Sequence, residues 1–401
     1  MSLRKKPVQQ GHRPSTGASS RIYSRDNVDR YSERARQRRR GRLVKRGVVT
    51  GLLAVLLVTV GAAGLWFARV VGNLGGNGYI ANSGILNILQ DSQLTREPFY
   101  VLLLGTDGRP GETNYRSDSI ILARIDPTEK EATLISIPRD TKVEFNGSPT
   151  KINSIHAFDE KDGGGPKGMV EAVNKLCGVK ISHYAEVSFD GMQQLIDAIG
   201  GIEINATDGV DDPEHLDIKI EPGQQHMDGA TALTYARARY QYADGDYTRM
   251  RHQRQVLGAI ASKVLNDLDA SKLPGLIESV SQMVMTDMSV QDILAVINAM
   301  RGMDVDSIYS ANLPSYADYD VDGVSYVFVY EDQLSEMMER VNAGEDPQGP
   351  QTQGDSGVTG GTLGDLNKNT SEDWSNGTAT TTDSDGDGVP DAEDDDSTDV
   401  E

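Results

Sequence analysis

Residues 100–137 read YVLLLGTDGRPGETNYRSDSIILARIDPTEKEATLISI. The stretch contains three short apolar runs, at 100–104, 119–125 and 132–137, and turn residues rich in glycine, proline and aspartate separate them. Runs of this length between turn signals are typical of buried β-strands. We therefore expect three neighbouring strands that form the centre of a sheet.

The chain beyond this stretch alternates strand and helix patterns. A strand at 184–189, a helix from Asp190 to Ile199 and a strand at 202–205 follow one another in the order of an α/β fold. Further helices are expected at 228–237, 248–268, 273–285, 290–301 and 331–342, and a further strand at 325–330. Because roughly 240 residues are enough for one large core, we predict a single α/β domain over residues 99–343.

The residues before this domain carry the pattern of a membrane anchor. Residues 47–68 have no charged side chain and extend over about 33 Å as a helix, which is enough to span a bilayer. Residues 1–46 hold 15 of the 39 basic residues of the chain but three of its 60 acidic ones. The positive-inside rule then predicts a basic cytoplasmic tail (1–46), one transmembrane helix (47–69) and an extracytoplasmic domain at the cell membrane.

Two other interpretations of the N-terminal region are weaker. A cleaved signal peptide is disfavoured because the apolar run is longer than the usual ~7–15 residues, although Val60-Gly61-Ala62 resembles a cleavage site. A nucleic-acid-binding arm is disfavoured because a tail of this kind sets topology and contacts anionic lipids. We expect a membrane partner and no nucleic acid. The lone Cys177 excludes an internal disulfide.

The segments on either side of the domain are expected to lack a core of their own. Residues 70–98 begin with a glycine-rich sequence and are predicted to be a linker, with one short helix around 85–89. Residues 344–401 are rich in Gly, Ser, Thr, Asn and Asp and have few large apolar side chains. Such a composition buries too little surface to fold, so we predict a disordered acidic tail.

Two aspartates flank the first predicted loop. Asp107 follows the strand 100–104, and Asp118 precedes the strand 119–125. Paired carboxylates at strand ends suit a hard divalent cation that also binds phosphate, and Mg²⁺ is the natural candidate. The alternative is an ordinary turn, because Gly-Thr-Asp-Gly is also a common turn sequence.

Basic residues gather at two further places. Arg139 follows the third strand, and Lys151 comes shortly after it, although surface salt bridges would explain both equally well. The densest group lies later, within residues 235–254, in a part of the chain that is otherwise acidic. Arginine grips phosphate with a planar fork, so such a group can neutralise a pyrophosphate. The alternative is a solvated basic helix.

The spacing of these arginines sets a geometric condition. On a continuous helix Arg237 and Arg239 would point about 200° apart, so both can meet one ligand only if the helix ends near Arg237. Arg249, Gln253 and Arg254 are separated by four and five residues, which we interpret as one shared face.

These residues stand in motifs whose order resembles the LytR-CpsA-Psr family of bacterial cell-wall enzymes. The seven motifs are LLGTD at 103–107, RSDS at 116–119, ISIPRD at 135–140, KIN at 151–153, DAIGG at 197–201, GATALTYARAR at 229–239 and DYTR at 246–249. The likeness covers about residues 99–257, with related sequence to about 342. Seven motifs in one order are hard to obtain by chance.

The resemblance implies an α–β–α sandwich with a mixed central sheet and one N-terminal membrane helix. It also implies transfer of a glycopolymer, such as teichoic acid, capsule or another wall polysaccharide, from a polyprenyl-pyrophosphate carrier to peptidoglycan. By motif, Asp107 and Asp118 would hold Mg²⁺, and Asp118 or Asp246 would act as base. The pyrophosphate would be bound by Arg139, Arg237, Arg239 and Arg249, and its head-group site completed by Lys151, Asp246 and Gln253.

The chain departs from the family pattern at one position of the site. Members often have Arg-Gln-Gln after the Asp-x-x-Arg segment, where this chain has His252-Gln253-Arg254. Arg251 or Arg254 is then the candidate to compensate for His252. The accessory domain that some members carry after the anchor has no room in residues 70–98, so we expect the catalytic domain close to the membrane.

The acidic tail contains one candidate calcium loop. Residues 383–394 read DSDGDGVPDAED, with oxygen-bearing groups at loop positions 1, 3, 5, 7, 9 and 12 and glycine at position 6. The carboxylate ligands would be Asp383, Asp385, Asp387, Asp391 and Asp394. The sequence resembles a thrombospondin type 3 repeat, but it is a single copy, and a merely acidic tail is an equal alternative.

Three functions are compatible with these patterns. The leading hypothesis is an Mg²⁺-dependent phosphotransferase that joins a lipid-linked glycopolymer to peptidoglycan. The second is a polyprenyl-pyrophosphate hydrolase, because water can replace the sugar hydroxyl at the same site. The third is a non-catalytic lipid-binding or regulatory protein of the cell envelope.

Overall fold

The computed structural model describes Leu65, Ala68, Val70 and six longer segments of the chain. These segments are residues 79–108, 115–269, 271–281, 284–320, 322–349 and 360–368. All elements named below belong to the unit Ala68–Glu401. Among the described residues, no helix has the length and apolar character needed to cross a membrane. The basic tail, nearly all of the expected span 47–69 and the candidate calcium loop lie outside the described residues and stay predictions.

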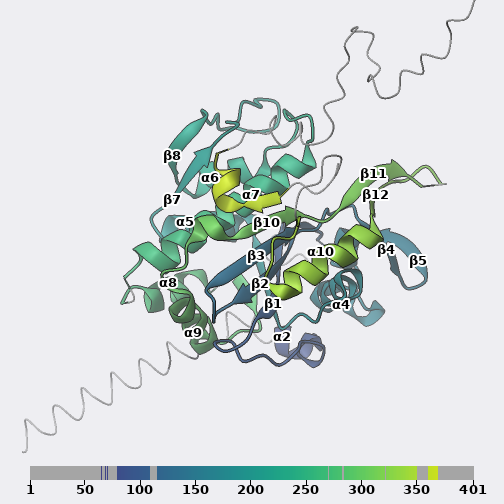
Figure 1. The fold of residues 1–401 in the computed structure, drawn as a ribbon, viewed down its shortest axis with the longest axis horizontal. Helices are drawn as coiled ribbons and strands as arrows, with labels where there is room; N and C mark the ends of the chain where they lie inside the picture. The colour runs from purple at the N-terminus through teal and green to yellow at the C-terminus, as the bar shows by residue number, and fades with distance from the viewer. Residues whose placement is uncertain are drawn as a thin grey trace, which may run out of the picture. The chain divides into compact units, whose positions relative to one another are not determined.

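A seven-stranded mixed sheet forms the centre of the domain (Figure 1), with the order β13-β10-β3-β2-β1-β6-β9. Its strands are β1 (Phe99–Thr106), β2 (Ser117–Asp126), β3 (Glu131–Ser136), β6 (His183–Ser188), β9 (Val284–Thr286), β10 (Tyr309–Asn312) and β13 (Gly360–Thr362). The strands β1, β2 and β3 pair antiparallel, whereas β1 with β6 and β3 with β10 pair parallel. The expected mixed sheet, with β1 to β3 at its centre, is therefore confirmed.

Apolar side chains on the two faces of the central strands enter two different cores. On one face Leu102, Leu104, Ile120 and Leu122 pack against α3 (Ile152–Ile155), α4 (Gly165–Cys177) and α10 (Glu331–Ala343). On the other face Val101, Ile121 and Ala123 pack against α9 (Val290–Met300) and α11 (Leu363–Leu366). Because strand side chains alternate between faces, nearly continuous apolar runs produce helices on both sides. This is the α–β–α layering expected above.

A third core lies beside the main sheet. It is built from α5 (Phe189–Ala198), α6 (Gly229–Arg237), α7 (Asp246–Ser262) and the hairpin of β7 (Ile202–Ala206) with β8 (Gly223–Met227). The expected strand 202–205 is β7, and it lies outside the main sheet. The position beside β6 is taken by β9, so β7 finds its partner in β8.

Smaller elements complete the described part of the chain. Two hairpins stand outside the main sheet, β4 (Lys142–Phe145) with β5 (Ser148–Lys151) and β11 (Ser315–Tyr319) with β12 (Ser325–Val329). The short helical elements are α2 (Tyr79–Asn82), η2 (Ile85–Asn87), η3 (Glu160–Asp162), the π-helical η4 (Lys263–Asp267), α8 (Leu273–Val280) and η5 (Val305–Ser307). The helix expected over 273–285 is therefore shorter, because residues 284–286 form the edge strand β9.

Both expected flanking segments contribute residues to the folded domain. Ile80 and Ile85, which we assigned to the linker, are 3% and 0% exposed and belong to the core under β1. Residues 360–368, which we assigned to the disordered tail, add β13 to the sheet through β10 and bury Leu363 and Leu366. The expectation of a tail without structure does not hold for these residues. These residues fold because β10 offers an unpaired sheet edge and two leucines become buried, although the average composition of the tail is polar.

Candidate active site

The candidate site lies at the edge of the sheet where β1 and β3 end and β2 begins. Asp107 directly follows β1, Arg139 follows β3, and Asp118 lies at the start of β2. Because β2 runs antiparallel to both neighbours, its first residues lie at the same edge as the last residues of β1 and β3. The strand order thus brings together residues that are separated in sequence.

Five of the expected residues are linked in a continuous chain of ion pairs and hydrogen bonds. Asp118 accepts a hydrogen bond of 2.7 Å from Arg139, and its backbone carbonyl accepts one of 3.3 Å from Arg249. Arg249 also pairs with Asp246 at 2.9 Å, one turn earlier in α7, and Asp246 lies 3.9 Å from Arg239. Three guanidinium groups and two carboxylates leave this arginine cluster with one excess positive charge.

Two hydrogen-bond donors of the cluster, and one on the residue before Asp118, have no partner among the described residues. Arg139 Nε, Arg249 Nε and the hydroxyl of Ser117 are buried and make no hydrogen bond within the described residues. Unpaired buried polar atoms cost about 1–3 kcal/mol each, and native proteins contain few of them. Three at one charged edge are what an anion-binding site needs, because anionic oxygens would satisfy all three.

Burial also sets the electrostatics of the two central arginines. The pKa of Arg249 is lowered, first by its burial and then by the nearby charge of Arg139, which Asp246 and Asp118 oppose. Burial also acts to lower the pKa of Arg139, but its hydrogen bond to Asp118 and the charge of Asp246 outweigh this effect, and the pKa is raised. The nearby carboxylates therefore offset the burial of the charge less fully at Arg249 than at Arg139. An anionic ligand would stabilise the charged form of Arg249 more.

The helix α6 ends at Arg237, as the expected sharing of one ligand by Arg237 and Arg239 requires. Arg237 is its last residue, and Ala238 is extended, with φ −60° and ψ 128°. Arg239 lies over the ring of Tyr240, 4.4 Å from its centroid, and faces Asp246, whereas Arg237 lies over Phe189 at 5.6 Å. The geometric condition derived from the sequence is met, although Arg237 makes no ion pair with the arginine cluster among the described residues.

An apolar cavity of about 70 Å³ lies between the sheet and the helices α5, α6 and α7. Gln253, whose amide donates to the carbonyl of Ala236 at 3.4 Å, lies on its wall together with Phe189. Its remaining lining comes from Leu103, Leu104, Gly105, Ser119, Ile121, Val187, Ser188, Met192, Leu233, Ala236, Val256 and Leu257. Phe189 lines this apolar cavity and also contacts Arg237, so an apolar binding region lies next to a charged one.

Two expected residues lie at the margin of the site. Lys151 pairs with Asp140 at 3.2 Å, and Asp140 directly follows Arg139, so the lysine is linked to the arginine cluster only indirectly. Asp107 is exposed at the end of β1, beside the loop 109–114, which lies outside the described residues. The described residues contain no group of three or more His, Cys, Asp or Glu side chains arranged to hold a metal ion.

The donor set nevertheless fits Mg²⁺. Asp107 follows the last residue of β1 and Asp118 is the second residue of β2, so the two carboxylates stand at the same edge of neighbouring antiparallel strands, offset along the ladder. Magnesium is usually held by one or two carboxylates, with phosphate and water oxygens completing its shell. Asp107 and Asp118 would be the protein ligands in such a site.

The expected compensation for His252 is wrong. Arg251 is bonded to Asp208, and Arg254 is fully buried and donates to Ser136, Ser310 and Asn312. His252 itself is 0% exposed, and its Nδ1 lies 3.1 Å from the carbonyl of Tyr235. Five residues along a helix correspond to a rotation of about 140°, so Arg254 points away from the face of Arg249.

A buried polar network that was not predicted from the sequence lies beneath the site. Glu186 on β6 lies 3.1 Å from His156 Nε2, contacts the hydroxyl of Tyr184 and receives a hydrogen bond of 3.4 Å from Thr106. His156 Nδ1 lies 3.0 Å from the carbonyl of Tyr115, and their rings are 4.9 Å apart. The network thus fixes the residue three positions before Asp118. A glutamate inside an apolar strand was the available signal.

The two titrating members of this network have opposite pKa shifts. Burial acts to lower the pKa of His156, but the hydrogen bond and charge of Glu186 outweigh it, and the pKa is raised above 6.5. Burial acts to raise the pKa of Glu186, but His156 and Tyr184 outweigh it, and the pKa is lowered below 4.5. Both groups are therefore charged between these values.

We expect the stabilisation from this pair to be largest between about pH 4.5 and 6.5. The histidine contribution is complete below its unfolded pKa and is lost as the pH rises through the folded pKa. The glutamate contribution is complete above its unfolded pKa and is lost as the pH falls through the folded one. Urea unfolding of the wild type and of His156→Gln across pH 3–9 measures the difference, and a difference independent of pH would contradict the pairing.

Comparison with known proteins places this site in a family. The model of the LytR_cpsA_psr family matches residues 82–343. The chain belongs to this family. The match begins before β1 and ends with α10, so it contains every residue of the arginine cluster.

Relatives of known name agree with the family. A polyisoprenyl-teichoic acid–peptidoglycan teichoic acid transferase, TagU of Enterococcus faecalis, is 32% identical over 259 residues, which are 61% of this chain and 79% of that one. Biofilm regulatory protein A of Streptococcus mutans is 31% identical over 61% of this chain and 63% of its own length. The crystal structure of Bacillus subtilis TagV matches with a TM-score of 0.54 and 27% identity, over 63% of this chain and 99% of that one.

Proposed function

We propose that this protein transfers a glycopolymer from a polyprenyl-pyrophosphate carrier to a sugar hydroxyl of peptidoglycan. The observation that carries the proposal is the arginine cluster with its excess positive charge, with three unpaired donors at the same edge, beside an apolar cavity. A pyrophosphate with a polyprenyl tail has the matching chemistry, since its anionic oxygens can take the donors and its first isoprene units can enter a widened cavity. The names of the transferase relatives describe the same reaction class.

In the proposed reaction, the acceptor hydroxyl attacks the phosphorus that bears the polymer. A new P–O bond forms to the acceptor sugar, the bond to the bridging oxygen breaks, and polyprenyl phosphate leaves. Arg139, Arg239 and Arg249 stabilise the charge on the phosphoryl oxygens and on the leaving phosphate. Asp118 and Asp246, each held by an arginine, are the two carboxylates placed to take the proton of the hydroxyl.

Two further parts of the proposal concern the surroundings of the site. Mg²⁺, held by Asp107 and Asp118, would neutralise charge on the pyrophosphate. Residues 47–69 would anchor the chain in the bilayer that also holds the polyprenyl tail, with residues 1–46 in the cytoplasm. A short connection from the anchor to Ile80 and Ile85 of the domain core would keep the site near the lipid surface.

The test uses the full chain in lipid nanodiscs with a synthetic polyprenyl-pyrophosphate oligosaccharide. We expect polyprenyl phosphate and an acceptor-linked product only when peptidoglycan fragments are present, and we expect Asp118→Asn to lower that rate about 10²-fold or more. Lys180→Ala, at an exposed position after α4, is the control. Release of the polymer onto water at the same rate without acceptor would identify a hydrolase instead, and binding without turnover would identify a non-catalytic protein.

A further inference from the structure

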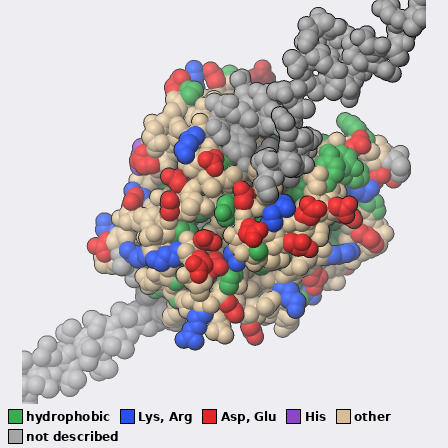
Figure 2. Space-filling view, in the orientation of Figure 1, with side chains coloured by type: hydrophobic (Ala, Val, Ile, Leu, Met, Phe, Trp, Pro, Cys, Tyr) green, Lys and Arg blue, Asp and Glu red, His purple; other side chains and the backbone are tan. Residues whose placement is uncertain are grey.

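The hairpin β11–β12 carries an exposed aromatic ladder on one face. The strands pair Tyr316 opposite Phe328, and Tyr326 and Tyr330 lie two residues from Phe328 on the same side. The ring centroids are 5.6 Å apart for Tyr316 and Phe328 and 4.8 Å for Tyr316 and Tyr330. Tyr316 and Tyr330 remain 40% and 38% exposed. Figure 2 shows hydrophobic side chains gathered over this hairpin.

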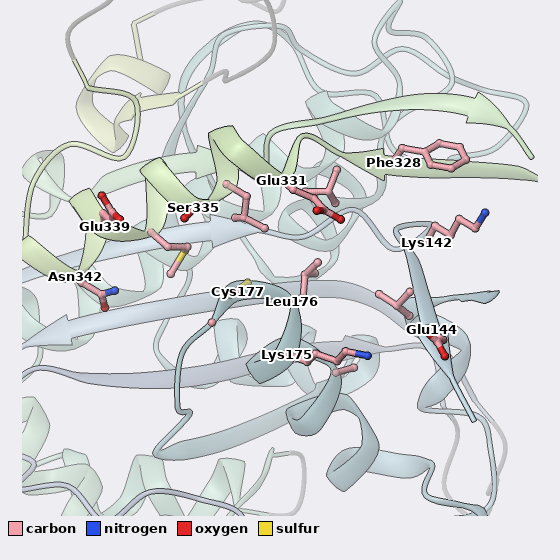
Figure 3. Close-up of a pocket in the computed structure, with 16 residues that line it drawn as sticks. Lys142, Glu144, Lys175, Leu176, Cys177, Phe328, Glu331, Ser335, Glu339 and Asn342 are labelled. Atoms are coloured by element: carbon pink, nitrogen blue, oxygen red, sulfur yellow. The ribbon is translucent and has the colours of Figure 1, made fainter. Parts of the chain in front are cut away.

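The ladder leads into a larger groove of about 810 Å³ between α4, α10, β4 and β12. Phe328 belongs to both features, and the ammonium group of Lys142 lies 5.1 Å from its ring centroid at the mouth of the groove. In Figure 3, Phe328 and Lys142 lie at one end of the groove and Asn342 at the other, with α10 along one side. Aromatic surface therefore continues into a groove with both polar and apolar walls.

Two hydrogen bonds attach this hairpin to segments of the candidate active site. The backbone N–H of Val327 donates to the carbonyl of Asp140, which directly follows Arg139, at 2.9 Å. The hydroxyl of Tyr247, which directly follows Asp246, lies 3.2 Å from the hydroxyl of Ser315 at the start of β11. The hairpin that carries the ladder is therefore joined directly to the residues that follow Arg139 and Asp246.

The charges around the ladder select among occupants. The hairpin and the groove together carry six acidic side chains, Asp318, Asp320, Asp322, Glu144, Glu331 and Glu339, against two lysines, Lys175 and Lys142, and Lys142 pairs with Asp320 at 2.6 Å. The net charge of this surface is therefore negative. Such a surface repels a polyanionic polymer and an anionic lipid surface. An uncharged pyranose chain suits it, because the C–H face of a sugar packs on an aromatic ring while hydroxyl and acetamido N–H groups donate to carboxylates. Exposed apolar patches next to grooves commonly mark binding sites.

We propose that the aromatic ladder and the groove beside it bind the N-acetylated sugar chain of the acceptor. This inference rests on the proposed function for the identity of the acceptor, but binding itself does not depend on transfer. The ladder holds the acceptor strand so that one of its hydroxyls reaches the phosphoryl group in the arginine cluster. The residues of the ladder are positioning residues for the acceptor and have no part in binding the lipid-linked donor.

The test combines Tyr316→Ala with Tyr330→Ala in the full chain in nanodiscs. Loss of two stacking rings predicts weaker binding by about fivefold or more. Calorimetry with a hexamer of N-acetylglucosamine measures the dissociation constant. Turnover assays measure the two KM values, and we expect the KM for the acceptor to rise by a similar factor and the KM for the donor to stay unchanged. The double Tyr→Phe variant keeps the rings and should bind within about threefold of the wild type.

Tyr319→Ala is the matched control, because Tyr319 is 71% exposed on the same strand but lies on the opposite face from Tyr316. Equal glycan binding by the double alanine variant and the wild type would overturn the inference. So would a loss confined to binding of phosphatidylglycerol vesicles, or a change confined to oligomeric state, since these would identify a membrane or a second copy as the occupant. A wild type that binds the hexamer at this face but transfers nothing would contradict the proposed function alone.

Discussion

Replacing Arg249 by alanine is expected to lower the rate of transfer about 10³-fold while leaving the fold intact. Arg249 links Asp118 and Asp246 and has an unpaired, buried Nε. Its charge is most useful when the pyrophosphate accumulates negative charge, and arginines in this role contribute about 10³–10⁵ in rate. We expect the loss chiefly in kcat, because the interaction strengthens in the transition state.

The stability of this variant distinguishes a binding residue from a structural one. Burial lowers the pKa of Arg249, so holding this cation in the folded protein costs free energy. Removing it should leave the thermal midpoint unchanged or slightly higher, as often occurs when a functional group is removed. Arg249→Lys keeps the charge but loses the planar fork and should recover part of the activity at most. Activity above a tenth of the wild-type rate in Arg249→Ala would remove this residue from the mechanism.

Replacing Arg254 by alanine is expected to have the opposite signature, with a loss of about 3–5 kcal/mol in the free energy of unfolding. Its side chain donates three hydrogen bonds of 2.6 Å, to Ser136 on β3 and to Ser310 and Asn312 on β10. The contacts join α7 to two strands of the sheet. Alanine would remove three buried hydrogen bonds and leave a cavity in place of the guanidinium group.

Urea unfolding measures this loss, with Lys180→Ala expected within about 0.5 kcal/mol of the wild type. Burial lowers the pKa of Arg254 to about 9, so keeping this side chain charged in the interior costs free energy. Arg254→Met therefore separates two effects, because methionine fills much of the space without the charge or the donors. If Arg254→Ala and Arg254→Met were both as stable as the wild type, the three hydrogen bonds would contribute nothing net.

The contrast between these two arginines shows where sequence reasoning reached its limit. Both lie in α7, five residues apart, and both were assigned to one face. Their environments differ because α7 packs over the sheet edge at Arg249 and against β3 and β10 at Arg254. The helical rotation of about 140° was available from the sequence. The sequence did not indicate which side of the helix would face the sheet.

Other differences arose from long-range partners. Tyr115, His156 and Glu186 come from three separate segments, and the pairing of β1 with β6 brings Glu186 to the side of the sheet where His156 connects it to Tyr115. In the same way, β13 has no strand pattern strong enough to identify it. It forms because β10 offers an unpaired edge and Leu363 a buried position behind it.

By itself, the sequence determined the features that depend on local chemistry. Apolar runs between turn residues specified β1, β2 and β3, and the positions of Asp107, Asp118 and Arg139 at strand ends followed from them. The tertiary structure alone decided which charges share a site, because ion pairs depend on strand order and helix orientation. It also decided that β11–β12 is joined to the residues that follow Arg139 and Asp246, because two hydrogen bonds connect these distant segments.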